Sequence, residues 1–138
     1  MGITEYVVLL CLAILAAIDL RIRKIPVLPV LFFGLFGVCF RLCTGGTFWE
    51  LAAGVMPGVF LLALAVCTRE SVGIGDGLVL LALGGFIGVA RAVAVLGMAL
   101  LLAAALSLWL LLWKKAKRKT ELPFLPCLCG GYLLCVLW

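Results

Sequence analysis

The chain has 138 residues, of which 67% are hydrophobic and 12% are charged, and its formal net charge is +5. Soluble domains carry roughly 25% charged residues and about half apolar ones, so this chain has too little polar surface for a soluble globule. The composition therefore predicts an integral membrane protein. Because almost nothing lies outside the apolar runs, we expect a single domain over residues 1–138.

Six apolar segments are predicted to cross the membrane as helices, which gives an all-α, polytopic bundle. In chain order they cover about residues 3–19, 27–42, 48–67, 76–90, 92–113 and 122–138. Arg91 is expected to mark a tight connection between the fourth and fifth segments. The first segment is interpreted as a retained span, because it lacks a basic start and a small-residue cleavage site.

Glycines in two of the segments predict close helix contacts. Gly54 and Gly58 lie four residues apart in the third segment, a spacing that lets two membrane helices approach closely. Gly84, Gly85 and Gly88 in the fourth segment are interpreted in the same way, as packing residues.

Basic residues set the predicted topology. Nine of the eleven Lys and Arg residues follow the first, third and fifth segments: Arg21, Arg23, Lys24, Arg69, Lys114, Lys115, Lys117, Arg118 and Lys119. The other two, Arg41 and Arg91, fall on the opposite side. The positive-inside rule then puts those three connections in the cytoplasm and both termini outside. This placement is the ordinary orientation signal of membrane proteins, so no nucleic-acid partner is expected.

Cysteine and histidine usage argues against a metal site. The chain has seven cysteines, nearly all inside apolar runs, with no Cys-x-x-Cys pair and no histidine. We interpret the cysteines as small apolar packing residues and disfavour a zinc site or a disulfide framework. Neither a metal nor a cofactor is expected.

Two aspartates stand at the junctions of spans with cytoplasmic connections. Asp19 ends the first segment, and Asp76 starts the fourth, directly after a glycine-rich stretch that contains Gly73 and Gly75 and continues to Gly77. Taken singly, Asp19 is explained equally well by pairing with a nearby arginine, and Asp76 by capping its helix. The glycines predict a tight turn with accessible backbone, which suits the holding of a peptide strand but also suits an ordinary loop.

Taken together, the two aspartates favour a catalytic pair. Like charges a few Å apart resist double ionisation, so two facing carboxyl groups share one proton. The ionised member takes a proton from water and the protonated member donates to the scissile carbonyl. This chemistry requires no histidine, metal or covalent intermediate.

Several stretches resemble the type IV prepilin peptidases. These are Asp19-Leu20-Arg21-Ile22-Arg23-Lys24-Ile25-Pro26, Gly73-Ile74-Gly75-Asp76, the glycine-containing segment after it, and Leu122-Pro123-Phe124-Leu125-Pro126. The resemblance runs through nearly the whole chain in the same order, and the combination of motifs is far more specific than Gly-x-Gly-Asp alone.

The resemblance implies a membrane aspartic endopeptidase of the bacterial cytoplasmic membrane. Such enzymes remove the short basic leader of prepilins and pseudopilins at the cytoplasmic face, and the two motif aspartates carry over to Asp19 and Asp76. Larger members also have a cysteine-rich segment and N-methyltransferase activity. The connection between the first two segments is too short for such a segment, so we expect cleavage without methylation.

Two positions depart from the family pattern, and other interpretations stay open. Val27 replaces the usual Asn after Ile-Pro, and Leu78 replaces a lysine found in many members. One alternative is a non-enzymatic membrane subunit or transporter whose aspartates are structural or bind ions, and another is an inactive relative. Glu70 and Glu121 could attract a basic leader, although solvated loop charges explain them as well. The substrate and the oligomeric state are left open by the sequence.

Overall fold

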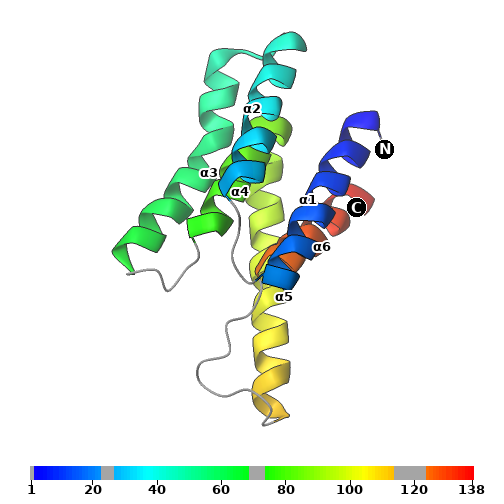
Figure 1. Cartoon of the computed structure of the whole chain (residues 1–138), viewed down its shortest axis with the longest axis vertical. Helices are drawn as coiled ribbons and strands as arrows, with labels where there is room; N and C mark the ends of the chain where they lie inside the picture. Colours follow the sequence, from blue (N-terminus) through cyan, green and yellow to red (C-terminus); the bar gives the residue numbers. More distant parts are fainter. Residues whose placement is uncertain (1, 23–26, 69–73, 114–123) are drawn as a thin grey trace.

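The computed structural model describes residues 2–22, 27–68, 74–113 and 124–138. This part of the chain forms six α-helices (Figure 1), which confirms the predicted all-α fold. They are α1 (Ile3–Ile22), α2 (Val27–Cys43), α3 (Phe48–Cys67), α4 (Ile74–Ile87), α5 (Val89–Leu112) and α6 (Phe124–Leu137).

The helices fall into two classes of length. Helices α1, α3 and α5 have 20, 20 and 24 residues and are long and apolar enough to cross a membrane. Helices α2, α4 and α6 are apolar but shorter, with 17, 14 and 14 residues. At 1.5 Å per residue, 14 residues reach only about 21 Å, less than the roughly 30 Å of a bilayer core. Three of the six predicted spans therefore meet the length criterion.

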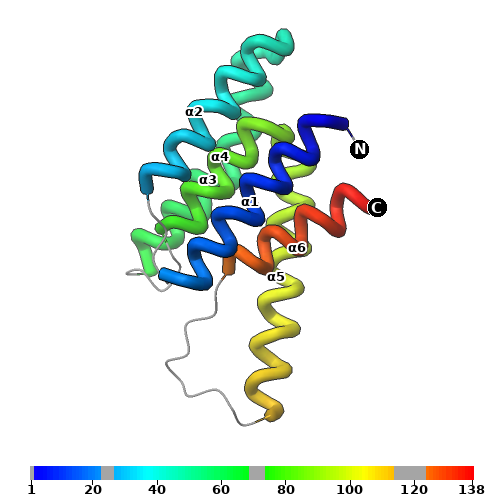
Figure 2. The backbone as a smooth tube through the Cα atoms, turned by 45° about the vertical axis from the view of Figure 1, so that its right-hand side comes forward, coloured from blue at the N-terminus to red at the C-terminus, as the bar shows by residue number. Residues whose placement is uncertain are grey.

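Helix α4 is the central element of the bundle. It packs most extensively on α3, then on α2, and also contacts α5. Helix α6 packs on α5 and α1, so that α1 and α6 form the other side of the molecule (Figure 1). Eight of the 14 residues of α4 are buried, as expected for a helix that is apolar on all faces. The C-terminal half of α5 runs past the ends of the other helices (Figure 2).

The predicted glycine contact is confirmed and lies between α3 and α4. A Cβ atom at Gly54 would overlap the carbonyl oxygen of Gly84, and a Cβ at Gly84 would overlap that of Gly54. A Cβ at Gly58 would likewise overlap the backbone of Leu81. Gly85, in contrast, has no atom within 4 Å of the corresponding position, so its predicted packing role is wrong.

The connection between α4 and α5 lies at Gly88 rather than at Arg91. Gly88 has φ +80°, a left-handed conformation that ends α4 without the steric cost a side chain would bring. Helix α5 then begins at Val89, so Arg91 sits inside its first turn. The sequence prediction placed the break three residues too late. A charged residue is a clear boundary signal in an apolar sequence, whereas Gly88 is one of several glycines in this segment.

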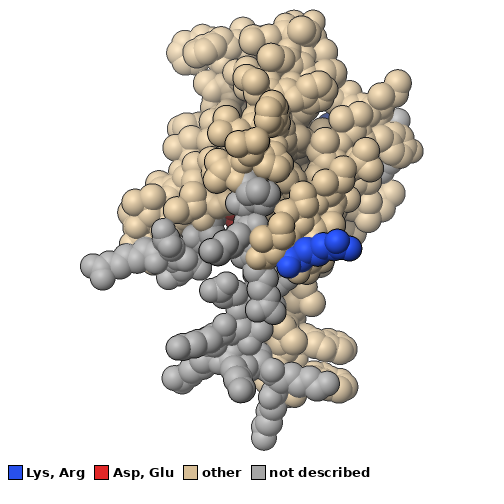
Figure 3. All heavy atoms as spheres, viewed as in Figure 1, with Lys and Arg blue, Asp and Glu red and all other residues tan. Residues whose placement is uncertain are grey.

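The outer surface of the bundle is apolar. Large side chains such as Phe32, Phe60 and Leu101 are exposed by 67%, 65% and 68%. Nearly all of the described residues visible in Figure 3 are uncharged. A soluble protein would bury such residues, whereas lipid tails accept them. The long apolar helices and this surface identify a multi-pass membrane protein.

Candidate active site

Asp19 lies in the last turn of α1. The helix continues past it to Ile22, so Asp19 is inside the helix rather than at its end as predicted. The buried residues Val8, Leu12, Leu15 and Ala16 form one stripe along α1. Asp19 follows Leu15 by four residues and Ala16 by three, a spacing that puts it on the same face. Its partly buried side chain therefore extends the packed stripe of α1.

Asp76 occupies the third position of α4. The helix begins at Ile74, so the interpretation of Asp76 as an N-cap is wrong. Val79 and Leu80, three and four residues later, are completely buried, which puts Asp76 on the inward face of α4. The side chain itself is partly buried. A carboxylate in the first turn also interacts favourably with the positive end of the helix dipole.

The two aspartates come from helices that are distant in sequence. The C-terminal end of α1 and the N-terminal end of α4 lie in the same half of the bundle (Figures 1 and 2). The negative charge of Asp19 acts on the carboxyl group of Asp76. Arg21 is exposed, and the ion pairs that the described residues form are Arg41–Glu50 and Glu5–Arg91, away from both aspartates. Arg23 lies outside the described residues.

The glycine-rich stretch is only partly a loop. Gly75 and Gly77 belong to the first turn of α4, and Gly73 lies outside the described residues. Gly77 is buried, and a Cβ atom there would come within 2.8 Å of Leu62 Cγ and 3.1 Å of the Leu62 backbone nitrogen. The prediction of an accessible turn was therefore wrong for these two glycines, because packing of α4 on α3 outweighs the low helix propensity of glycine. Gly77 lets the segment that carries Asp76 sit directly against α3.

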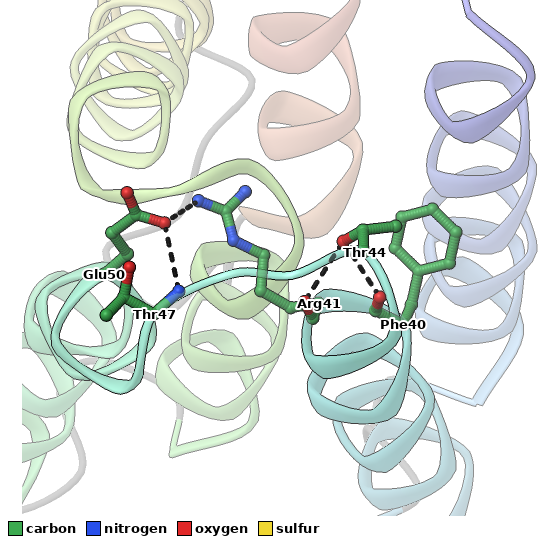
Figure 4. Close-up of polar contacts among 5 residues, drawn as sticks. All are labelled: Phe40, Arg41, Thr44, Thr47 and Glu50. Atoms are coloured by element: carbon green, nitrogen blue, oxygen red, sulfur yellow. Dashed lines mark hydrogen bonds and ion pairs between the residues drawn. The ribbon is translucent and has the colours of Figure 1, made fainter.

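The polar residues at the opposite end of α3 form a helix cap instead of a catalytic cluster (Figure 4). Arg41 Nη2 donates to Glu50 Oε2 at 3.1 Å, and the same oxygen accepts from the backbone N–H of Thr47 at 3.4 Å. Thr44 Oγ1 donates to the carbonyl oxygens of Phe40 and Arg41. These contacts supply hydrogen-bond partners to backbone groups at the ends of α2 and α3. The polar residues at this end of the bundle therefore have a structural role.

The positions that depart from the family motifs have different surroundings. Val27 is the first residue of α2 and is 56% exposed. Leu78, two residues after Asp76, is partly buried and packs against the apolar core. No three His, Cys, Asp or Glu side chains within the described ranges are arranged as metal ligands.

Comparison with known proteins agrees with the motifs. Residues 6–110 match the model of the type IV leader peptidase family. The chain belongs to this family. No curated protein and no solved structure matches it. The matched range includes Asp19 and Asp76, whereas the stretch from Leu122 to Pro126, which also resembles this family, lies beyond it.

Sequence reasoning did not find Leu62, the residue that Gly77 packs against, because nothing in the local sequence of α3 distinguishes it from its apolar neighbours.

Proposed function

We propose that the protein is a membrane aspartic endopeptidase that removes the basic leader from prepilins or pseudopilins. The observation that carries this proposal is the placement of the two aspartates on the inward faces of α1 and α4, where the charge of one acts on the other. Membership of the type IV leader peptidase family supports the same reaction. A structural role at a lipid interface would not require both carboxylates to extend packed faces.

In the proposed mechanism, the Asp19–Asp76 pair holds one proton. The ionised carboxylate removes a proton from a water molecule as that water attacks the scissile carbonyl carbon. The protonated carboxyl group donates its proton to the carbonyl oxygen, which gives a tetrahedral intermediate without a covalent bond to the enzyme. Collapse of the intermediate transfers a proton to the leaving amine and breaks the C–N bond. The partly buried setting of both groups strengthens their mutual electrostatic interaction.

The proposed site faces the cytoplasm. Nine of the eleven basic residues lie at or shortly after the C-terminal ends of α1, α3 and α5 in the sequence, on the side that also carries the aspartates, and the positive-inside rule makes this the cytoplasmic side. A basic leader would then approach from the cytoplasm while the apolar helix of the substrate stays in the bilayer. Glu70 and Glu121, both on this side in the sequence, lie outside the described residues. The proposed reaction is cleavage without methylation of the new N-terminus.

The test is a cleavage assay in cells that produce the protein with a prepilin from the same genome. Asp19→Asn and Asp76→Asn should each lower the cleavage rate by roughly 100- to 10,000-fold, the range that general acid–base catalysis contributes. Glu50→Gln, a carboxylate-to-amide change in the cap at the other end of α3, is the matched control and should keep cleavage near the wild-type rate.

Membrane level and thermal unfolding of each variant establish that it is folded. Normal cleavage by both folded aspartate variants would show that the carboxylates are structural. A wild-type protein that leaves every prepilin and pseudopilin of the genome uncut would favour an inactive relative.

A further inference from the structure

A cavity of about 210 Å³ lies at the end of the bundle opposite to the aspartates. It is lined by Glu5 in the first turn of α1, Arg91 in the first turn of α5, and Tyr132, Cys135 and Trp138 near the C-terminal end of α6. Along α1, Glu5 and Asp19 are roughly 20 Å apart at 1.5 Å per residue. The cavity is therefore separate from the proposed active site.

The cavity contains a buried hydroxyl group without a partner. Tyr132 is 2% exposed, and its hydroxyl oxygen makes no hydrogen bond with any described residue. Buried polar groups are nearly always paired, so an unpaired one indicates a missing partner. Glu5, Arg91 and Tyr132 all line this cavity, so one anion, one cation and one neutral hydrogen-bonding group surround the same space.

The ion pair over the cavity is loose. Arg91 Nη1 and Glu5 Oε1 are 3.4 Å apart, and the Arg91 side chain is 66% exposed while that of Glu5 is 26% exposed. Exposed pairs of this kind contribute little to stability, so a ligand that offers each group a better partner can separate them. The remaining donors of the guanidinium suit a phosphate group, and the carboxylate suits an ammonium group.

The position of the cavity along the helices indicates which ligand could reach it. Its charged residues lie in the first turns of α1 and α5, where apolar helices reach the polar boundary of the bilayer. Trp138, which also lines it, is of the residue type enriched at lipid head groups. We propose that this cavity binds the head group of an ethanolamine phospholipid, with its phosphate on Arg91 and its ammonium N–H groups on Glu5 and the Tyr132 oxygen.

The proposal is tested on full-length protein purified in detergent and titrated with short-chain phospholipids, with binding followed by native mass spectrometry. Phosphatidylethanolamine should bind about tenfold more tightly than phosphatidylcholine, which has the same charges but no N–H donor, because hydrogen bonds to charged groups are worth that much. Phosphatidylglycerol, which lacks the ammonium group, should also bind more weakly.

Variants assign the binding to this cavity. Tyr132→Phe removes only the hydroxyl and should weaken phosphatidylethanolamine binding about fivefold. Tyr6→Phe is the matched control, since Tyr6 is exposed on α1 and does not line the cavity, and it should bind like the wild type. Glu5→Gln should reduce the preference for ethanolamine over choline, and Arg41→Gln, in the other ion pair, should not.

Three results would overturn the proposal. The first is equal binding of the ethanolamine and choline lipids by the wild type. The second is unchanged binding by a folded Tyr132→Phe variant, which would make the cavity a packing defect. The third is equally tight binding of soluble glycerophosphoethanolamine, which would assign the site to a free metabolite instead of a membrane lipid. Neither cleavage activity nor the aspartates enter these measurements, so they are independent of the proposed function.

Discussion

At the scale of single residues, Gly77 connects packing to the proposed chemistry. It is the residue directly after Asp76, and its missing side chain lets the first turn of α4 rest on Leu62 of α3. The position of the Asp76 carboxyl group therefore depends on a contact made by its neighbour. In reactions that need well-placed groups, displacements of about 1 Å can cost 100-fold in rate.

Gly77→Ala is expected to lower cleavage by about tenfold or more while the protein still reaches the membrane. The added Cβ would come within 2.8 Å of Leu62 Cγ, which forces α4 away from α3. Cleavage assays on Gly77→Ala, Leu62→Ala and the double variant measure the coupling between the two positions. The double variant should recover part of the lost rate, because Leu62→Ala removes the side-chain atoms with which the new Cβ at position 77 would clash. Additive losses in the double variant would contradict this account.

At the scale of secondary structure, the α3–α4 contact is the tightest described packing in the bundle. Gly54 and Gly84 face each other so closely that backbone lies against backbone. Membrane helices have no hydrophobic drive to associate beyond that of lipid, so close packing of this kind holds them together. Gly85, the next residue along α4, has open space beside it.

This difference makes adjacent glycines a matched pair. Gly84→Ala should destabilise the bundle by about 1–3 kcal/mol, the usual cost of overpacking. Gly85→Ala should leave stability unchanged or raise it by up to about 1 kcal/mol, since alanine is the better helix former. Thermal unfolding of the purified variants in one detergent gives the comparison. Equal destabilisation by both substitutions would show that α4 does not pack more closely on α3 at Gly84 than at Gly85.

Helices were predicted well from the sequence, and their ends less well. Long apolar runs bounded by charge specify each helix, and the spacing of Gly54 and Gly58 was enough to predict a close contact. The start of α4 was missed because its glycines disfavour a helix locally, and only burial against α3 and Leu62 makes it form. The cavity around Tyr132 was also invisible, because three helix ends build it and no local pattern links Glu5, Arg91 and Tyr132.

At the scale of the whole molecule, the sequence predicted that both aspartates lie at the same membrane face. Asp19 ends the first segment and Asp76 starts the fourth, and in a chain that crosses the membrane at each segment these two ends lie on the same side. Their separation depends on how α1 and α4 sit in the bundle, which no spacing in the chain encodes. Aromatic residues mark a membrane boundary at the end of α5. Trp109 and Trp113 stack with ring centroids 5.7 Å apart at the end of α5, just before a stretch, 114–119, in which five of the six residues are basic, and such aromatic residues are common at membrane interfaces.

Native cysteines test this orientation. Cys43 ends α2 and Cys67 ends α3, both are exposed, and the proposed topology puts them on opposite sides of the membrane. In intact spheroplasts, a membrane-impermeant maleimide should label Cys43 and should reach Cys67 only after the membrane is opened. Cys43→Ser and Cys67→Ser variants assign the two signals by mass spectrometry. Labelling of Cys67 in sealed cells would invert the proposed topology.

The two ion pairs at the end of the bundle away from the aspartates have a consequence for membrane insertion. In the proposed orientation, Arg41 and Arg91 are the basic residues carried outward, and each is matched by a carboxylate, Glu50 and Glu5. Moving an unmatched positive charge outward works against the membrane potential at about 2.3 kcal/mol per 100 mV. Arg41 and Glu50 cross together in the α2–α3 hairpin as a pair without net charge, so the cell's voltage neither opposes nor assists that step. The potential would act instead on the excess of basic over acidic residues on the proposed cytoplasmic side, and so would favour the proposed orientation.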